Sequence, residues 1–96
     1  MRKRKLVLSK SFEKSYKKFI AKKPALKPVI EKALLELEKD AFAPGLKTHK
    51  LSGNLYGYFA CSCGYDCRII FSIEKNIKPK GEFILLIDLG THEEVY

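Results

Sequence analysis

The sequence predicts an α+β fold in which a small antiparallel-type sheet packs against an N-terminal helical hairpin. Apolar residues recur at helical spacing as far as residue 40, and from residue 55 onward they follow the patterns of strands. The length of 96 residues suits one domain, residues 1–96, with one modest hydrophobic core. The predicted element order is therefore β-α-α-β-β-β.

Proline and serine mark out the first three elements. Lys5–Ser9 is predicted to be a short strand built on three consecutive apolar residues. A helix follows, with Ser11 as its N-cap, and we expect Pro24 to end it. A second helix is predicted over Ala25–Asp40, where Pro28 is tolerated because the first turn leaves its missing N–H without a helical partner. The apolar stripes of the two helices are Phe12, Tyr16, Phe19 and Ile20, and Leu26, Ile30, Ala33, Leu34 and Leu37.

Three further strands are predicted in the second half of the chain. Leu55–Cys63 and Asp66–Ile73 flank the turn signal Gly64-Tyr65. A longer turn over Glu74–Gly81 separates the second of these strands from the third, Phe83–Leu89. This last segment is almost continuously apolar, as in a strand that is covered on both faces.

Positive charge is concentrated in the first half of the chain. The protein has a formal net charge of +8, and residues 1–50 hold 15 Lys/Arg against 5 Asp/Glu, whereas residues 51–96 hold 4 against 6. Such a basic half attracts polyanions, of which nucleic acid is the most common in a cell. An acidic protein partner or an anionic membrane surface would respond to the same field, so the charge alone leaves these alternatives open.

The sequence gives no sign of export or of a membrane span. The basic start, residues 1–5, is followed by only three apolar residues, too few for the apolar region of a signal peptide. No apolar run approaches the roughly 18 residues of a membrane span. We therefore expect a cytoplasmic protein that does not enter a membrane, and we expect its three cysteines to be reduced.

Alternation along the strand that starts at Asp66 separates its side chains into two sets. Cys67, Ile69, Phe71 and Ile73 are expected to face the helices. Asp66 and Arg68, together with Ile70 and Ser72, are expected on the face that the helices leave open. An aspartate and an arginine on an open face are candidates for chemistry, and an ordinary surface ion pair is the alternative.

The three cysteines do not have the spacing of a metal site. Cys61-x-Cys63-x-x-x-Cys67 lacks the paired C-x-x-C pattern of structural zinc sites. Free cysteine is often simply an interior residue, so these are interpreted as small buried hydrophobic side chains. We expect no metal and no cofactor.

The two histidines lie in segments that flank the predicted sheet. His49 precedes it, between Lys47 and Lys50, and His92 follows the last strand. Imidazole is the natural proton carrier near neutral pH, and the two lysines are candidate phosphate contacts. Tyr96, the last residue, has a ring suited to stacking on an RNA base. The alternatives are solvated loop side chains and a frayed chain end.

Three segments together resemble the RelE/ParE superfamily of bacterial and archaeal toxins, and in particular its YafQ-like branch. They are Leu46-Lys47-Thr48-His49-Lys50-Leu51-Ser52-Gly53, Tyr65-Asp66-Cys67-Arg68-Ile69-Ile70-Phe71 and Gly90-Thr91-His92-Glu93-Glu94-Val95-Tyr96. The resemblance covers essentially the whole chain, and the order and spacing of the segments make it specific. It implies the RelE-like fold.

The resemblance also implies an activity, namely cleavage of messenger RNA in the ribosomal A site by the toxin of a type II toxin–antitoxin pair. His49, Asp66 and His92 match the family's histidines and aspartate, and Tyr96 stands where the family has an aromatic residue. Arg68 resembles the arginine that related toxins place near the scissile phosphate. An acidic antitoxin protein and mRNA on the ribosome are the implied partners.

This chain departs from the YafQ-like pattern at one position. Ser62 stands where the pattern has a further histidine, four residues before the aspartate. Serine does not carry protons at neutral pH, so the reaction would have to use fewer imidazoles. The remaining groups still suit attack of the RNA 2′-OH on the adjacent phosphate, which needs a base, an acid and a cation but no metal.

Two other functions fit the same fold. The first is inhibition of DNA gyrase by binding, as in ParE-type toxins, and the second is a catalytically silent module that binds RNA or protein. His49, Asp66 and His92 argue against the first, because an inhibitor that acts by binding has no need of them.

Overall fold

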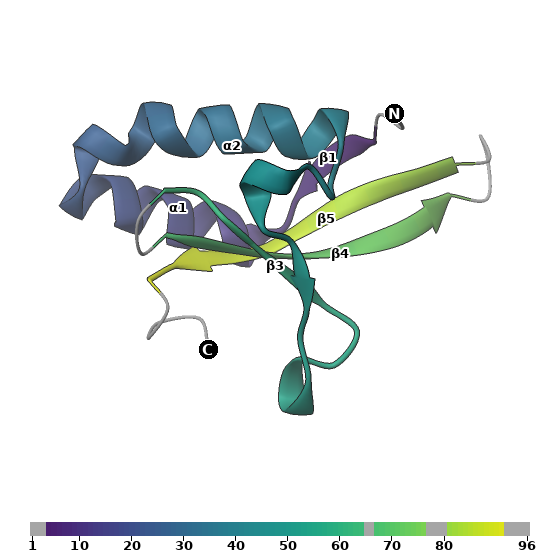
Figure 1. The fold of residues 1–96 in the computed structure, drawn as a ribbon. Coiled ribbons are helices and arrows are strands. Elements are labelled where there is room, and N and C mark those ends of the chain that lie inside the picture. Colours follow the sequence, from purple (N-terminus) through teal and green to yellow (C-terminus); the bar gives the residue numbers. More distant parts are fainter. Residues whose placement is uncertain (1–3, 65–66, 77–80, 92–96) are drawn as a thin grey trace.

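Two helices form a hairpin that lies over one face of a five-stranded sheet (Figure 1). The structure is a computed structural model, and it describes residues 4–64, 67–76 and 81–91. The helices and strands are β1 (Lys5–Leu8), α1 (Lys10–Lys22), α2 (Lys27–Lys39), β2 (His49–Lys50), β3 (Phe59–Ser62), β4 (Arg68–Asn76) and β5 (Gly81–Gly90). The predicted α+β fold and its helical hairpin are confirmed.

The sheet is mixed, with the strand order β1-β5-β4-β3-β2. β2, β3, β4 and β5 pair antiparallel, whereas β1 pairs parallel with β5 and places Leu6 opposite Ile84. β2 is a two-residue edge strand that the sequence analysis did not predict. The strand predicted from Leu55 begins only at Phe59, and Leu55 itself ends a 3-10 helix, Gly53–Leu55. β1 ends opposite Leu86, and α1 then runs beside the rest of β5 (Figure 1).

The start of α1 differs from the prediction. Ser9 is the N-cap, because its hydroxyl oxygen accepts a hydrogen bond from the backbone N–H of Phe12 at 3.0 Å. Ser11 lies inside the helix, and its hydroxyl donates to the carbonyl of Ile87 in β5 at 2.7 Å. The prediction of a cap at Ser11 is therefore wrong. α1 ends before Pro24 and α2 carries Pro28 in its first turn, as predicted.

The hydrophobic core fills the space between the hairpin and the sheet. Phe12, Ile30 and Leu37 from the helices are fully buried against Ile69 and Phe71 of β4. The alternation predicted for β4 is confirmed on this side, since Cys67, Ile69, Phe71 and Ile73 all belong to or pack against the core. Among the described residues, no helix is long and apolar enough to cross a membrane.

The face that the helices leave uncovered is less open than the alternation suggested. Ile70 of β4 and its neighbour Ala60 of β3 are buried on this face, and Ser72 is only 3% exposed. Ala60 and Ser72 have short side chains, and Leu85 of β5 lies opposite Ser72. Arg68, at the beginning of β4, remains half-buried, so the polar surface of this face lies toward that end.

The cysteines depart from the expectation of three free thiols. Cys63 and Cys67 form a disulfide with their Cα atoms 5.0 Å apart, and the N–H of Cys63 donates to the carbonyl of Cys67 at 2.9 Å. They face each other across the short turn between β3 and β4, which is the geometry a disulfide requires. Cys61 is free and buried, and burial raises the pKa of its thiol to about 12. The prediction that all three are buried is confirmed.

Candidate functional site

Arg68 begins β4 and occupies the centre of the candidate site. It pairs with Ser62 of β3 on one side and with Gly90 of β5, which has no side chain, on the other. One guanidinium nitrogen, Nη1, donates to the carbonyl of Cys67 at 3.1 Å. The disulfide ties this same residue to the end of β3. This hydrogen bond holds the guanidinium of Arg68 near the backbone of Cys67 and leaves most of its N–H donors for a ligand.

His49 lies on β2, where its pairing with Ala60 determines the face of the sheet on which its side chain lies. Its Nδ1 lies 3.1 Å from the carbonyl oxygen of Lys47. A carbonyl can only accept, so this contact places the proton on Nδ1 and leaves Nε2 as the basic nitrogen. Lys47 adopts a left-handed backbone conformation, with φ 53°, and the Thr48 hydroxyl donates to the carbonyl of Ala41 at 2.6 Å. These two features fix the loop that presents the imidazole.

The register places His49 and Arg68 on the same face of the sheet. His49 pairs with Ala60 and Ala60 pairs with Ile70, which lies two residues from Arg68 along β4. Directly opposed residues, and residues two apart on a strand, share a face. Two interstrand spacings and one two-residue step put the two Cα atoms about 12 Å apart. A base and a cation at this separation can contact one phosphodiester between them.

The other predicted site residues are distributed as follows. Asp66, His92 and Tyr96 lie outside the described residues. Lys47 and Lys50 are exposed, and Lys50 pairs with Phe59, which packs edge-on against Phe42 on the helix side of the sheet. Within the described ranges, no group of three or more His, Cys, Asp or Glu side chains is placed to hold a metal ion.

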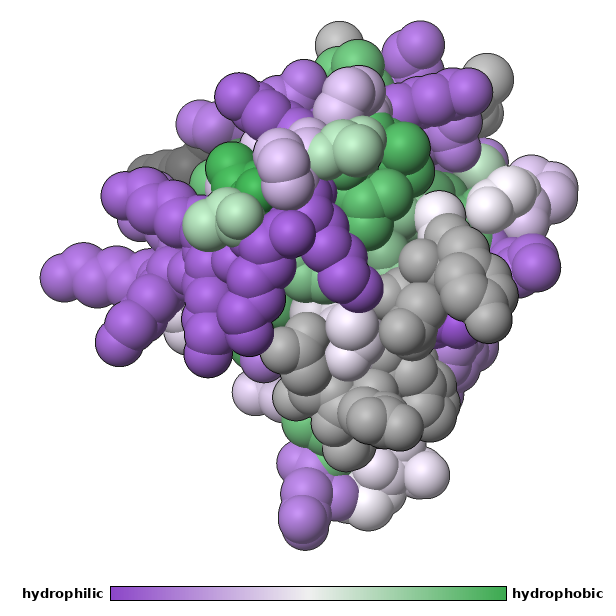
Figure 2. All heavy atoms as spheres, turned by 90° about the vertical axis from the view of Figure 1, so that its left-hand side faces the viewer, coloured by the Kyte–Doolittle hydropathy of each residue, from purple (hydrophilic) through white to green (hydrophobic). Residues whose placement is uncertain are grey.

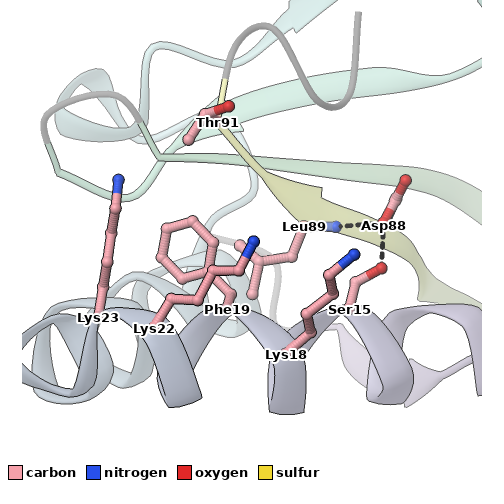
Figure 3. A pocket seen from close by; sticks show the side chains of 8 residues that line it. All are labelled: Ser15, Lys18, Phe19, Lys22, Lys23, Asp88, Leu89 and Thr91. Atoms are coloured by element: carbon pink, nitrogen blue, oxygen red, sulfur yellow. Dashed lines mark hydrogen bonds between the residues drawn. The ribbon is translucent and has the colours of Figure 1, made fainter.

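A hollow of about 610 Å³ lies next to this site, between α1 and the end of β5 (Figure 3). Lys18 and Lys22 of α1 and Lys23, the residue after this helix, surround it, and Phe19 and Leu89, which are almost completely buried, also line it. Its remaining lining residues are Ser15, Asp88 and Thr91. The molecule therefore has a basic recess at the same end of the sheet as Arg68.

The helical repeat of α1 builds this hollow. Ser11, Ser15, Lys18 and Lys22 follow one another at spacings of four, three and four residues and so lie along one stripe of the helix. Ser11 and Ser15 dock on β5, and Ser15 donates to Asp88 Oδ1 at 2.6 Å. The two lysines follow where β5 comes to its end. The first half of this stripe therefore packs against β5, and the second half lines the hollow.

The sequence analysis did not identify Asp88 as a site residue. The one available signal was a charged residue inside an otherwise apolar strand segment, Phe83–Leu89. A β-bulge next to Ile70 and Phe71 shifts the pairing of β5 at this point, and Asp88 Oδ1 accepts from both Ser15 and the backbone N–H of Leu89, the latter at 2.8 Å. Such irregularities re-aim side chains next to functional sites.

One family model matches nearly the whole chain. The model of the bacterial YafQ toxin of type II toxin–antitoxin systems matches residues 4–96. No protein of curated function matches the sequence significantly. A copper-bound mutant toxin from Helicobacter pylori is 25% identical, with a TM-score of 0.74 over 96% of this chain and 98% of that chain.

Two complexes with antitoxins share the fold. A chain of the E. coli DinJ–YafQ toxin–antitoxin complex is 18% identical, with a TM-score of 0.73 over 99% of each chain. A chain of the YoeB–YefM complex from Staphylococcus aureus is 20% identical, with a TM-score of 0.69 over 95% of this chain and 99% of that chain. The family match spans nearly the whole sequence, and the chain therefore belongs to the YafQ family of bacterial toxins of type II toxin–antitoxin systems.

Proposed function

We propose that this toxin is an endoribonuclease that cleaves messenger RNA on the ribosome without a metal ion. The observation that supports the proposal is that the strand register puts His49, whose Nδ1 contacts the Lys47 carbonyl, and Arg68 on one face of the sheet. A gyrase inhibitor that acts by binding has no use for a histidine in a defined tautomer. The proposal treats residues 1–96 as one toxin domain that acts in the cytoplasm, where ribosomes are found.

The reaction is attack by the RNA 2′ oxygen on the adjacent phosphorus. A bond forms between O2′ and phosphorus, the bond from phosphorus to O5′ breaks, and the products are a 2′,3′-cyclic phosphate and a 5′-OH. His49 Nε2 suits removal of the 2′ proton, and Asp66 and His92 share the proton transfers, including protonation of O5′. Arg68 offsets the negative charge that builds on the phosphate oxygens. Tyr96 stacks on a base, and Lys47 and Lys50 contact phosphates.

The open position of these groups supports dependence on the ribosome. His49 is exposed on an edge strand and Arg68 is half-buried at the start of β4, so neither lies in a deep cleft. In-line attack requires the RNA strand to be held in one conformation. The ribosomal A site would supply this, and the free protein should cut naked RNA very slowly.

The antitoxin is proposed to be an acidic protein. The structures of DinJ–YafQ and YoeB–YefM hold relatives of this fold together with their antitoxins. The first 50 residues carry most of the positive charge, and they include both helices of the hairpin. An acidic segment that orders on this surface would gain both steering and affinity from the charge.

Total RNA from cells that express the toxin tests the activity against its main alternative. We expect shortened transcripts from the wild-type protein and intact transcripts from Arg68→Ala. Lys75→Ala, which removes an exposed positive charge from the far end of the same strand, is the matched control and should cleave like wild type. Intact mRNA accompanied by DNA damage would instead identify a gyrase inhibitor.

A further inference from the structure

The hollow beside α1 combines groups that the proposed reaction does not use. The side chains of Lys18, Lys22 and Lys23 rise from the helix around it, and Asp88 lies at the end of the recess near Ser15 (Figure 3). Figure 2 looks at this end of the molecule and shows hydrophilic side chains crowded along one side of it. Three ammonium groups against one carboxylate leave the recess with an excess of positive charge, which favours an anionic ligand.

The residues that line the hollow also favour a ligand with hydrogen-bond donors. Asp88 Oδ1 accepts hydrogen bonds from Ser15 and from the N–H of Leu89, which fixes the carboxylate, and neither of these bonds uses the second oxygen. A carboxylate accepts hydrogen bonds only, so this oxygen suits a ligand that carries N–H donors. Phe19 and Leu89 also line the recess but are almost completely buried, and Lys23 Nζ lies 5.5 Å from the centroid of the Phe19 ring. A ligand that carries both negative charge and N–H donors matches this lining, and a nucleotide with an amino group on its base is such a ligand.

The position of the hollow connects it to the candidate active site. Thr91, on its rim, directly follows Gly90, and Gly90 is the residue paired with Arg68. Asp88 pairs with Ile70, which lies two residues from Arg68 along β4, so Asp88 and Arg68 lie on the same face of the sheet. An RNA strand held by Arg68 therefore passes within reach of the recess. An acidic peptide also matches the lysines, and its backbone N–H groups also suit Asp88, so it is the nearness to Arg68 that favours RNA.

We propose that this hollow binds one nucleotide of the RNA substrate next to the cleaved bond. Lys18 and Lys22 contact its phosphates, and Asp88 accepts from an exocyclic amino group of its base. The inference rests on the proposed function, because it names a subsite of the same RNA. It makes two statements that can be tested separately, one about phosphate contacts and one about the identity of the base.

The phosphate contacts are tested with full-length protein and a fluorescent 2′-O-methyl RNA heptamer, which cannot be cleaved. We compare Lys18→Gln/Lys22→Gln with Lys14→Gln/Lys32→Gln, which removes the same charge from exposed positions outside the hollow. The hollow variant should bind about tenfold more weakly, and its plot of log affinity against log salt should be less steep by about 1.4, or 0.7 for each lost phosphate contact. The control should change affinity by less than about twofold.

The identity of the base is tested with heptamers of a single base. Adenine, cytosine and guanine carry an exocyclic amino group and uracil does not, so the wild-type protein should bind the uracil heptamer most weakly. Asp88→Asn turns an acceptor into a mixed donor and acceptor and should remove this difference, and circular dichroism checks that the variant is folded. Equal binding of all four heptamers by the wild type would contradict the role given to Asp88.

The outcomes distinguish this inference from the proposed function. If the hollow and control variants bind RNA equally while Arg68→Ala abolishes mRNA cleavage, the subsite is wrong and the nuclease stands. If the hollow variant loses affinity for a polyglutamate peptide but not for RNA, the recess belongs to an acidic protein partner and the inference is overturned. Loss of RNA affinity in the hollow variant alone supports the subsite, even if no mRNA cleavage is found.

Discussion

Removal of the Cys63–Cys67 disulfide should cost a small and calculable part of the protein's stability. The bond joins residues four apart, so it closes a loop of five residues. In the chain-entropy model, a loop of this size lowers the entropy of the unfolded chain by about 7 cal/mol/K, which corresponds to about 2 kcal/mol at 25 °C. We therefore expect the reduced protein to stay folded on its core and to unfold at a urea concentration lower by about 1 to 2 M.

Urea unfolding followed by circular dichroism, with and without a dithiol reductant, measures this cost. Cys63→Ala/Cys67→Ala is the companion variant, and its midpoint should not respond to the reductant. It should also lie somewhat below that of the reduced wild type, because the two sulfur atoms are buried and their removal leaves space in the core. Equal midpoints for the oxidised and reduced wild type would refute the assignment of a stabilising cross-link.

Three further predictions concern the cap, the free thiol and the antitoxin. Ser9→Ala should lower the free energy of unfolding by about 1 kcal/mol and Ser11→Ala by less, because only Ser9 caps α1; thermal or urea unfolding of both variants checks this. Burial raises the pKa of the Cys61 thiol to about 12, so iodoacetamide at pH 8 should label no cysteine in the native oxidised protein. After denaturation without reductant it should label one cysteine, and labelling of three would disprove the disulfide. Antitoxin affinity, measured by calorimetry, should fall as salt rises, and an affinity independent of salt would count against an electrostatic interface.

The parts of the fold that depend on local pattern were predictable from the sequence. Cys67, Ile69 and Phe71 face the core because alternate side chains on a strand must do so, whatever the rest of the chain is. The ends of the helices near Pro24 and Pro28 follow from the missing N–H of proline. These constraints act between residues that are close in the chain, so they can be read from a single sequence.

The parts that depend on distant neighbours were not predictable in this way. Ser9 and Ser11 are equally good caps by composition, and the choice between them depends on where β1 ends against β5. The disulfide was missed because the argument from cellular compartment says nothing about which cysteines face each other across a turn. The hollow requires the lysines of α1 to meet Asp88, which lies some 70 residues later in the chain and is re-aimed by a bulge.

Single-turnover cleavage on ribosomes programmed with mRNA, with chemical identification of the fragment ends, tests the central claim most directly. We predict a 5′-OH on one fragment and a 2′,3′-cyclic phosphate or 3′-phosphate on the other. Arg68→Ala should slow the reaction by roughly 10²- to 10³-fold with partial recovery in Arg68→Lys, His49→Ala by roughly 10²- to 10⁴-fold, and Ser62→Ala very little. Fragments with a 5′-phosphate, or full activity in His49→Ala, would contradict the mechanism.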